Sequence, residues 1–177
     1  MNFEFKHLLN EDFHPASKVW VYQSSRLFTM SEALQIEEMI NQFAQTWLSH
    51  GVPVKGAAHL FFGQFVVLMA DETATGVSGC STDSSMRLIK EIEKTFGVNM
   101  FDRLALAFIV KEKSDSYRIQ LLPMPQLKHA VEQGFITANT PFFNNVVLTK
   151  EELENNWIIP AKDSWLAKKI SFPNTVS

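Results

Sequence analysis

Cysteine is almost absent from this chain, which has one thiol, Cys80, among its 177 residues. A single cysteine excludes an intramolecular disulfide framework and is typical of a protein that works in a reducing compartment. The N-terminal segment carries acidic residues and has no clean apolar core, so we expect no signal peptide there. Together these features predict a cytoplasmic protein.

Clustered positive charge and long apolar runs are also missing. No run of Lys or Arg is longer than two residues, and the net charge is −3. Because a phosphate backbone is bound by clustered cations, we expect no nucleic-acid partner. The longest charge-free apolar run, residues 59–70, has about a dozen residues, whereas a membrane helix needs about 20. We therefore expect no membrane association.

The composition is that of a globular protein, with 46% hydrophobic and 20% charged residues. A chain of this length can bury a core of its own. We see no internal repeat and no low-complexity linker, but prolines punctuate short elements from residue 123 onward. We predict a single domain over residues 1–177, with an α+β core at 15–122 and a C-terminal helical wrap at 123–177.

The first half of the core shows strand and helix patterns in turn. Residues 18–23, KVWVYQ, are β-branched and aromatic and predict a strand. Thr29 and Glu32 have the spacing of a capping box, and apolar residues then recur at helical spacing. Two strand-like runs follow around Gly63-Gln64, which predicts a hairpin with a type II′ turn. The second run, residues 65–70, is apolar on both faces, which predicts a central strand.

A second amphipathic pattern, ending near Phe96, predicts another helix, and residues 104–110 and 117–123 predict two further strands. The order strand-helix-strand-strand-helix-strand, followed by one extra strand, is that of the split βαβ motif. We therefore predict an α+β protein with a ferredoxin-like sheet. In our interpretation its first and third strands are parallel neighbours, so that both main helices begin at the same end of the sheet.

Several short motifs resemble those of a bacterial family of small proteins of unknown function. They are VWVYQSSR, HG at 50–51, TGVSGCSTDSS before a helix, FDR at 101–103 and ELENNWIIPAKDSW near the end. Genome annotation often labels members of this family as ABC transporter ATPases, and the resemblance implies no activity beyond that label. A P-loop requires G-x-x-x-x-G-K-[ST], but Gly76 and Gly79 are too close together and no lysine follows before Lys90. We expect no ATP hydrolysis.

The segment ATGVSGCSTDSS, residues 74–85, has the residue types of a binding loop. It is also an ordinary helix start, with a hydroxyl cap and an acidic residue in the first turn. If the two main helices begin side by side, their free amides and one guanidinium can bind a small anion or an acidic group of a protein partner. The residues of this predicted site are Ser24, Ser25, Arg26, Cys80, Ser81, Thr82, Asp83 and Ser84.

Cys80 also permits a different class of function. A thiol just ahead of a helix start can have a lowered pKa and act as a nucleophile, with His50 or His59 as its base. A lone cysteine is, however, more often a small buried apolar residue. The histidines show no metal-ligand spacing, so we expect no metal and no cofactor. We favour a non-enzymatic binding or interaction module and keep a thiol-dependent enzyme as the alternative.

Overall fold

The structure is a computed structural model that describes residues 2–49, 51–73 and 82–173. It is a mixed α/β protein whose described strands form two larger antiparallel sheets and one short two-stranded ladder. The chain divides into two compact units. Of the described residues, the N-terminal unit comprises 3–102 and 146–154 with the gaps stated above, and the C-terminal unit comprises residue 2, residues 103–145 and residues 155–173.

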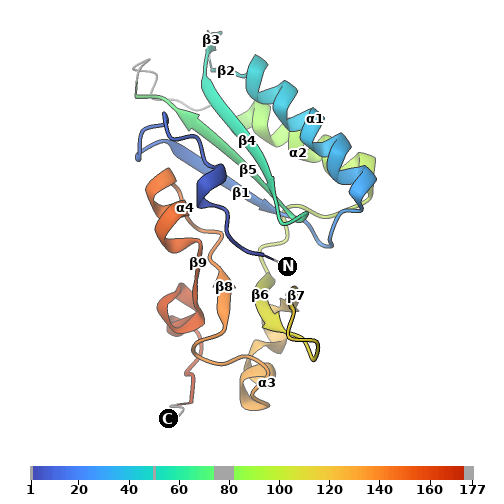
Figure 1. Ribbon diagram of the computed structural model, residues 1–177, viewed down its shortest axis with the longest axis vertical. Coiled ribbons are helices and arrows are strands. Elements are labelled where there is room, and N and C mark those ends of the chain that lie inside the picture. The colour runs from blue at the N-terminus through green and yellow to red at the C-terminus, as the bar shows by residue number, and fades with distance from the viewer. Residues whose placement is uncertain (1, 50, 74–81, 174–177) are drawn as a thin grey trace. The chain divides into compact units, whose positions relative to one another are not determined.

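The N-terminal unit is built on a three-stranded sheet in the order β1-β5-β4 (Figure 1). β5 is buried along its whole length, because it has a strand on each side and packed side chains on both faces. The prediction that this apolar run is a central strand is confirmed. The elements of the unit are η1 (Lys6–Leu8), β1 (Lys18–Gln23), α1 (Met30–Thr46), β2 (Leu48–Ser49), β3 (Val52–Pro53), β4 (Lys55–Phe61), β5 (Phe65–Asp71), α2 (Thr82–Phe96) and the first residues of α4 (Lys150–Asn156).

The helices α1 and α2 cover one face of this sheet, and the N-terminal segment crosses the other face (Figure 1). On the helical face, Leu68 of β5 packs in one cluster with Ile40 of α1 and Ile89 of α2. On the other face, the ring of Phe5 lies 5.6 Å from the ring of Phe61. The edge strand β4 therefore lies between α1 and the N-terminal segment.

Local signals in the sequence are largely confirmed in this unit. Thr29 accepts a hydrogen bond from the amide of Glu32, whose carboxylate accepts one from the amide of Thr29, which completes the predicted capping box. The hairpin between β4 and β5 is also present, but its turn is not type II′. Phe62 and Gly63 both have positive φ, 56° and 63°, which is the pattern of a type I′ turn.

The predicted direction of the strands is wrong. β1 and β5 are neighbours, as expected, but they pair antiparallel, with Val19 opposite Met69. Because α1 follows β1 and α2 follows β5, the two helices begin at opposite ends of the sheet. The ferredoxin-like topology is not confirmed either, because the strands after α2 belong to the second sheet.

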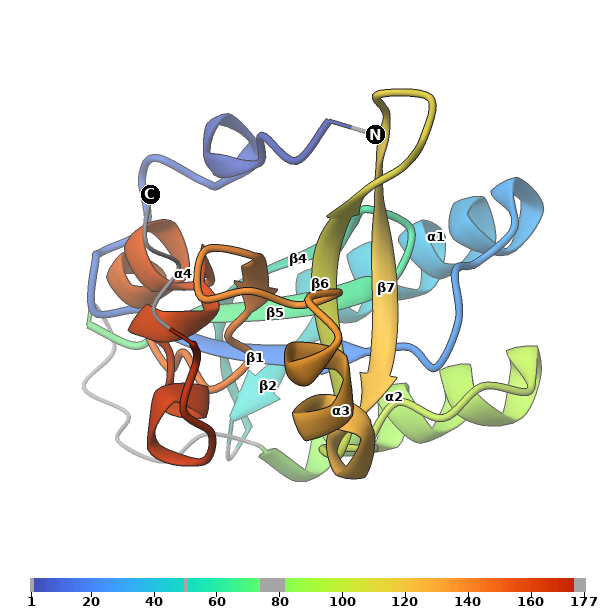
Figure 2. The ribbon, with the colours of Figure 1, turned by 90° about the horizontal axis from the view of Figure 1, so that it is seen from below.

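The C-terminal unit contains a four-stranded antiparallel sheet in the order β7-β6-β8-β9, in which β6 and β7 form a long hairpin (Figure 2). Its core joins Phe108 and Phe142 of the sheet to Leu127 of α3 and Leu166 of the last 3-10 turn. The predicted division at residue 122 is not followed, and the single-domain assignment stays a prediction. The elements are β6 (Ala105–Lys111), β7 (Tyr117–Pro123), η2 (Met124–Gln126), α3 (Leu127–Glu132), β8 (Pro141–Phe143), β9 (Ile158–Pro160), η3 (Ala161–Asp163) and η4 (Trp165–Lys168).

Within the described ranges, no helix has both the length and the apolar character needed to cross a membrane.

Gly56 allows the end of α1 to approach β4 closely. A Cβ atom on Gly56 would lie 2.8 Å from Cε3 of Trp47 and 3.4 Å from the carbonyl oxygen of Ala44. Because Trp47 is buried and has little room to move, we expect Gly56→Ala to lower the free energy of unfolding by about 1–3 kcal/mol. Urea denaturation measures this loss. A Trp47→Leu background should reduce it, and an equal loss in both backgrounds would contradict the packing explanation.

Candidate functional site

Three residues of the predicted anion site lie in the connection between β1 and α1. Ser24 is fully buried, and its backbone amide donates to the Gln64 carbonyl oxygen at 2.8 Å. Its own carbonyl accepts a hydrogen bond from Nε2 of Gln64 at 3.1 Å, and its hydroxyl accepts one from the amide of Arg26 at 3.4 Å. Ser24 therefore fixes the connection to the β4–β5 hairpin.

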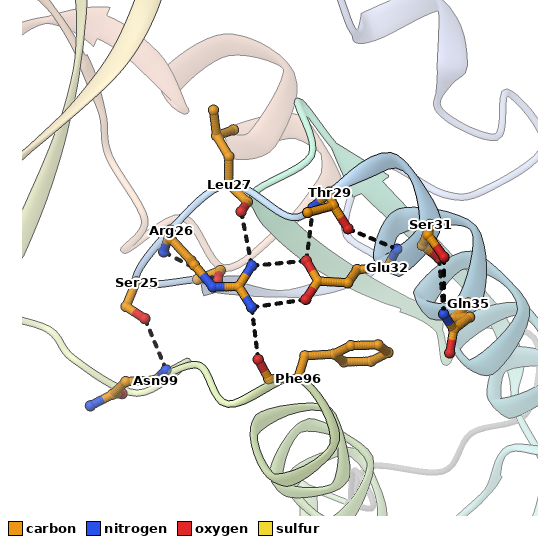
Figure 3. Close-up of polar contacts among 10 residues, drawn as sticks. Ser25, Arg26, Leu27, Thr29, Ser31, Glu32, Gln35, Phe96 and Asn99 are labelled. Carbon is orange, nitrogen blue, oxygen red and sulfur yellow. Dashed lines mark hydrogen bonds and ion pairs between the residues drawn. The ribbon is translucent and has the colours of Figure 1, made fainter.

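Ser25 and Arg26 contact the C-terminal end of α2. Ser25 exchanges two hydrogen bonds with Asn99, at 2.9 and 3.0 Å, and Nη2 of Arg26 donates to the carbonyl oxygen of Phe96 at 2.8 Å (Figure 3). α2 begins at Thr82, which is roughly 20 Å away at 1.5 Å per helical residue. The expectation that the two helix starts meet is therefore wrong, because antiparallel β1 and β5 place the start of α1 beside the end of α2.

The guanidinium of Arg26 is engaged by groups of the protein itself. It forms two parallel hydrogen bonds with the carboxylate of Glu32, at 2.8 and 2.9 Å, and a third with the carbonyl oxygen of Leu27 at 3.1 Å (Figure 3). This paired geometry is the strongest that arginine makes with a carboxylate. Arg26 thus ties the first turn of α1 to the last turn of α2, and its charge is balanced without an added anion.

The remaining residues of the predicted site are only partly described. Cys80 and Ser81 lie outside the described residues, and so does His50. Thr82 and Asp83 form the start of α2, but their side chains are not among those described, and Ser84 is half-buried in the same turn. A thiol-dependent activity of Cys80 therefore stays a prediction.

A different feature of the N-terminal unit has the geometry of a binding site. A cavity of about 240 Å³ lies beside β4, the edge strand of the three-stranded sheet, which pairs only with β5 among the described strands. Glu37, Ile40 and Asn41 of α1 form one wall, and Leu8 of η1 contributes from the other side. The strand residues 58–61 complete the lining. The cavity thus follows the open edge of β4 between a helix and the N-terminal segment.

Hydrogen bonds at the two ends of β4 show which of its backbone groups face this edge. The carbonyl oxygen of Phe61 accepts a bond from Gln64 across the hairpin turn, so the polar groups of Phe61 point toward β5. The amide of Val54 donates to the Trp47 carbonyl oxygen, so it points away from β5. Because these directions alternate along an antiparallel strand, Ala58 and Leu60 direct their N–H and C=O groups outward, into the open edge.

His59 is the titratable residue of β4 that lines the cavity. Its Nε2 lies 3.2 Å from Oδ1 of Asn10, and its ring stacks on Phe61 with centroids 5.2 Å apart. Burial lowers the pKa of His59 below its ordinary value, so the imidazole is neutral at pH 7. His59 was one of two predicted bases for Cys80, and its described hydrogen bond goes to Asn10 instead.

The α1 wall carries uncompensated negative charge. Residues 30–46 contain Glu32, Glu37 and Glu38 and no lysine or arginine. Glu32 is paired with Arg26, but neither Glu37 nor Glu38 has an ion-pair partner within the part of the chain that the structure describes, and both are exposed. Leu34, one turn before Glu37 on the same face, is 62% exposed. The wall therefore combines acidic groups with accessible apolar surface.

The sequence contained no direct signal for this site. Leu8 and Asn10 belong to an N-terminal segment without a clear periodic pattern, and they reach β4 only through the tertiary fold. The acidic face of α1 was visible in the sequence, but such a face is usually an ordinary solvated surface. Only the fold shows that it lies beside an edge strand.

Among the described residues, no group of three or more His, Cys, Asp or Glu side chains is placed to hold a metal ion. No family model, curated protein or solved structure matches the chain. The resemblance to the bacterial family stays a prediction.

Glu32 should make the stability of the protein depend on pH. The hydrogen bonds from Arg26 and from the Thr29 amide lower the pKa of Glu32 from its ordinary 4.5 to about 2. A lowered pKa contributes stability that is complete above pH 4.5 and is lost as the pH falls toward 2. We expect the free energy of unfolding to fall more steeply over this range in the wild type than in Glu32→Gln. Urea titrations at several pH values test this, and equal slopes would contradict it.

Amide hydrogen exchange should alternate along β4. We expect the outward amides of Ala58 and Leu60 to exchange faster than the amides of Ala57 and His59, which bond to β5. Nuclear magnetic resonance resolves the four sites in one sample, so neighbouring residues serve as internal controls. Equal protection at Ala57 and Ala58 would show that the edge is not open.

Proposed function

We propose that this protein is a non-enzymatic binding module that recognises an extended segment of another protein and adds it as a strand beside β4. The observation that supports this proposal is the free edge of β4, which opens into a cavity of about 240 Å³. A binding module is also the class of function that the sequence favoured. The site that we propose lies at the sheet edge, however, and not at the helix starts.

The backbone of β4 offers a ready template for an incoming strand. Ala58 and Leu60 present outward N–H and C=O groups that have no hydrogen-bond partner among the described residues. Strand addition satisfies such groups with main-chain hydrogen bonds, while pockets for alternate side chains provide selectivity. The cavity between α1 and Leu8 lies at this part of the edge, beside residues 58–61.

The cavity has room for a large side chain of the bound segment. An apolar cavity of roughly 150 Å³ accommodates a benzene ring, so the larger space beside β4 can take one aromatic or branched aliphatic group. Ile40 and Phe61 supply apolar surface there, and the Asn41 amide supplies a polar group. Glu37 and His59 also line the cavity, so its surface is mixed, with polar and apolar groups side by side.

A second copy of the chain is a less suitable occupant. Antiparallel pairing of β4 with itself would use a two-fold axis perpendicular to the sheet, which places both copies of α1 on the same face. Glu37 and Glu38 would then approach their own counterparts, and like charges in that position are destabilising. The charge of α1 therefore favours a segment from a different protein.

A labelled heptapeptide of alternating threonine and valine, TVTVTVT, tests strand addition. We expect it to bind the full chain and to shift the amide resonances of Ala58 and Leu60 as their outward groups become hydrogen-bonded. Ala58→Pro removes one outward N–H, which an edge strand tolerates, whereas Ala58→Gly retains it. Binding should be at least ~10-fold weaker in Ala58→Pro than in Ala58→Gly, in keeping with the loss of about one or two hydrogen bonds.

Circular dichroism confirms that both variants are folded before binding is compared. If Ala58→Pro does not fold, the resonance shifts in the wild type decide the question alone. Peptide binding without a change at Ala58 or Leu60 would overturn the proposal.

A further inference from the structure

We infer that the segment bound beside β4 is cationic, with lysine or arginine at the positions that face α1 and apolar side chains at the alternate positions that face Leu8. This inference rests on the proposed function and specifies the chemistry of the partner.

The first step is the direction in which side chains point. Ala58 and Leu60 pack with the helices on the α1 side of β4. His59 and Phe61 point to the opposite side, where they contact Asn10 and Phe5. A strand added to the edge lies about 4.8 Å farther out, and its side chains alternate between the same two sides. Every second residue of the segment therefore faces the α1 wall.

The second step is the charge of the α1 wall. Glu37 lines the cavity, and Glu38 is its exposed neighbour on the helix. Neither carboxylate has an ion-pair partner among the described residues, since the nearest arginine in sequence, Arg26, is held by Glu32. A lysine or arginine on the segment would compensate this charge, and a carboxylate at the same position would be repelled.

The third step is the contrast with the opposite side. Leu8 is 53% exposed there and offers apolar surface beside Phe61. An apolar side chain of the segment on this side would pack on Leu8. The two sides therefore select an alternating basic and apolar pattern.

Three labelled peptides of equal length test this pattern against the full chain: KVKVKVK, TVTVTVT and EVEVEVE. In 50 mM salt we expect KVKVKVK to bind at least ~10-fold more tightly than TVTVTVT, and EVEVEVE to bind more weakly than both. The preference should shrink at about 300 mM salt, because the acidic wall is exposed to solvent. Fluorescence anisotropy measures the three affinities.

The double variant Glu37→Gln, Glu38→Gln should lose most of the preference for KVKVKVK over TVTVTVT. The double variant Glu91→Gln, Asp163→Asn is the matched control, because it removes the same two charges from exposed carboxylates that do not line the cavity. These substitutions should leave the preference intact. An equal loss in the control would mean that net charge, and not the α1 wall, attracts the peptide, and would overturn the inference.

Other outcomes separate this inference from the proposed function. If all three peptides bind equally and shift Ala58 and Leu60, strand addition stands and the cationic preference is overturned. If KVKVKVK binds equally well to Ala58→Pro and Ala58→Gly, it adheres outside the edge of β4, and the inference fails. If no peptide binds and the chain instead self-associates with protection of Ala58, the occupant is a second copy, and both proposals fail.

Discussion

The antiparallel pairing of β5 with β1 on one side and β4 on the other determines the organisation of the N-terminal unit. It places the beginning of α1 next to the end of α2, and it leaves β4 at the edge. The full burial of β5 fixes this register, because a shift by one residue would exchange the side chains of its two faces. The free edge and its two flanking walls are therefore consequences of where one apolar strand lies.

Arg26 illustrates how the fold adds contacts to a residue that the sequence had singled out. Its position near a helix start suggested an anion site, but the same first turn contains Glu32, which both completes the capping box and holds the guanidinium. The carboxylate is the internal counterpart of the anion that we expected. The sequence showed Thr29 and Glu32 as a pair, and only the fold shows that Arg26 joins them and reaches Phe96.

What could be predicted from the sequence was local, and what could not was long-range. The capping box, the central character of β5 and the β4–β5 hairpin follow from neighbouring residues. The direction of β1 relative to β5 depends on pairing across more than forty positions, as between Val19 and Met69, which no short pattern records. The turn at Phe62 was missed for a related reason. A phenylalanine with positive φ is unfavourable locally, and here its ring packs against Phe3, 5.1 Å away, which is distant in sequence.

The close approach at Gly56 has a consequence for the kinetics of recognition. α1 is fixed at its end, where Trp47 packs over Gly56, and at its beginning, where Arg26 joins it to α2. A wall held at both ends is preorganised, so the loss of conformational entropy on association falls mainly on the incoming chain. The rate of capture would then be governed by how often that chain is already extended when it arrives.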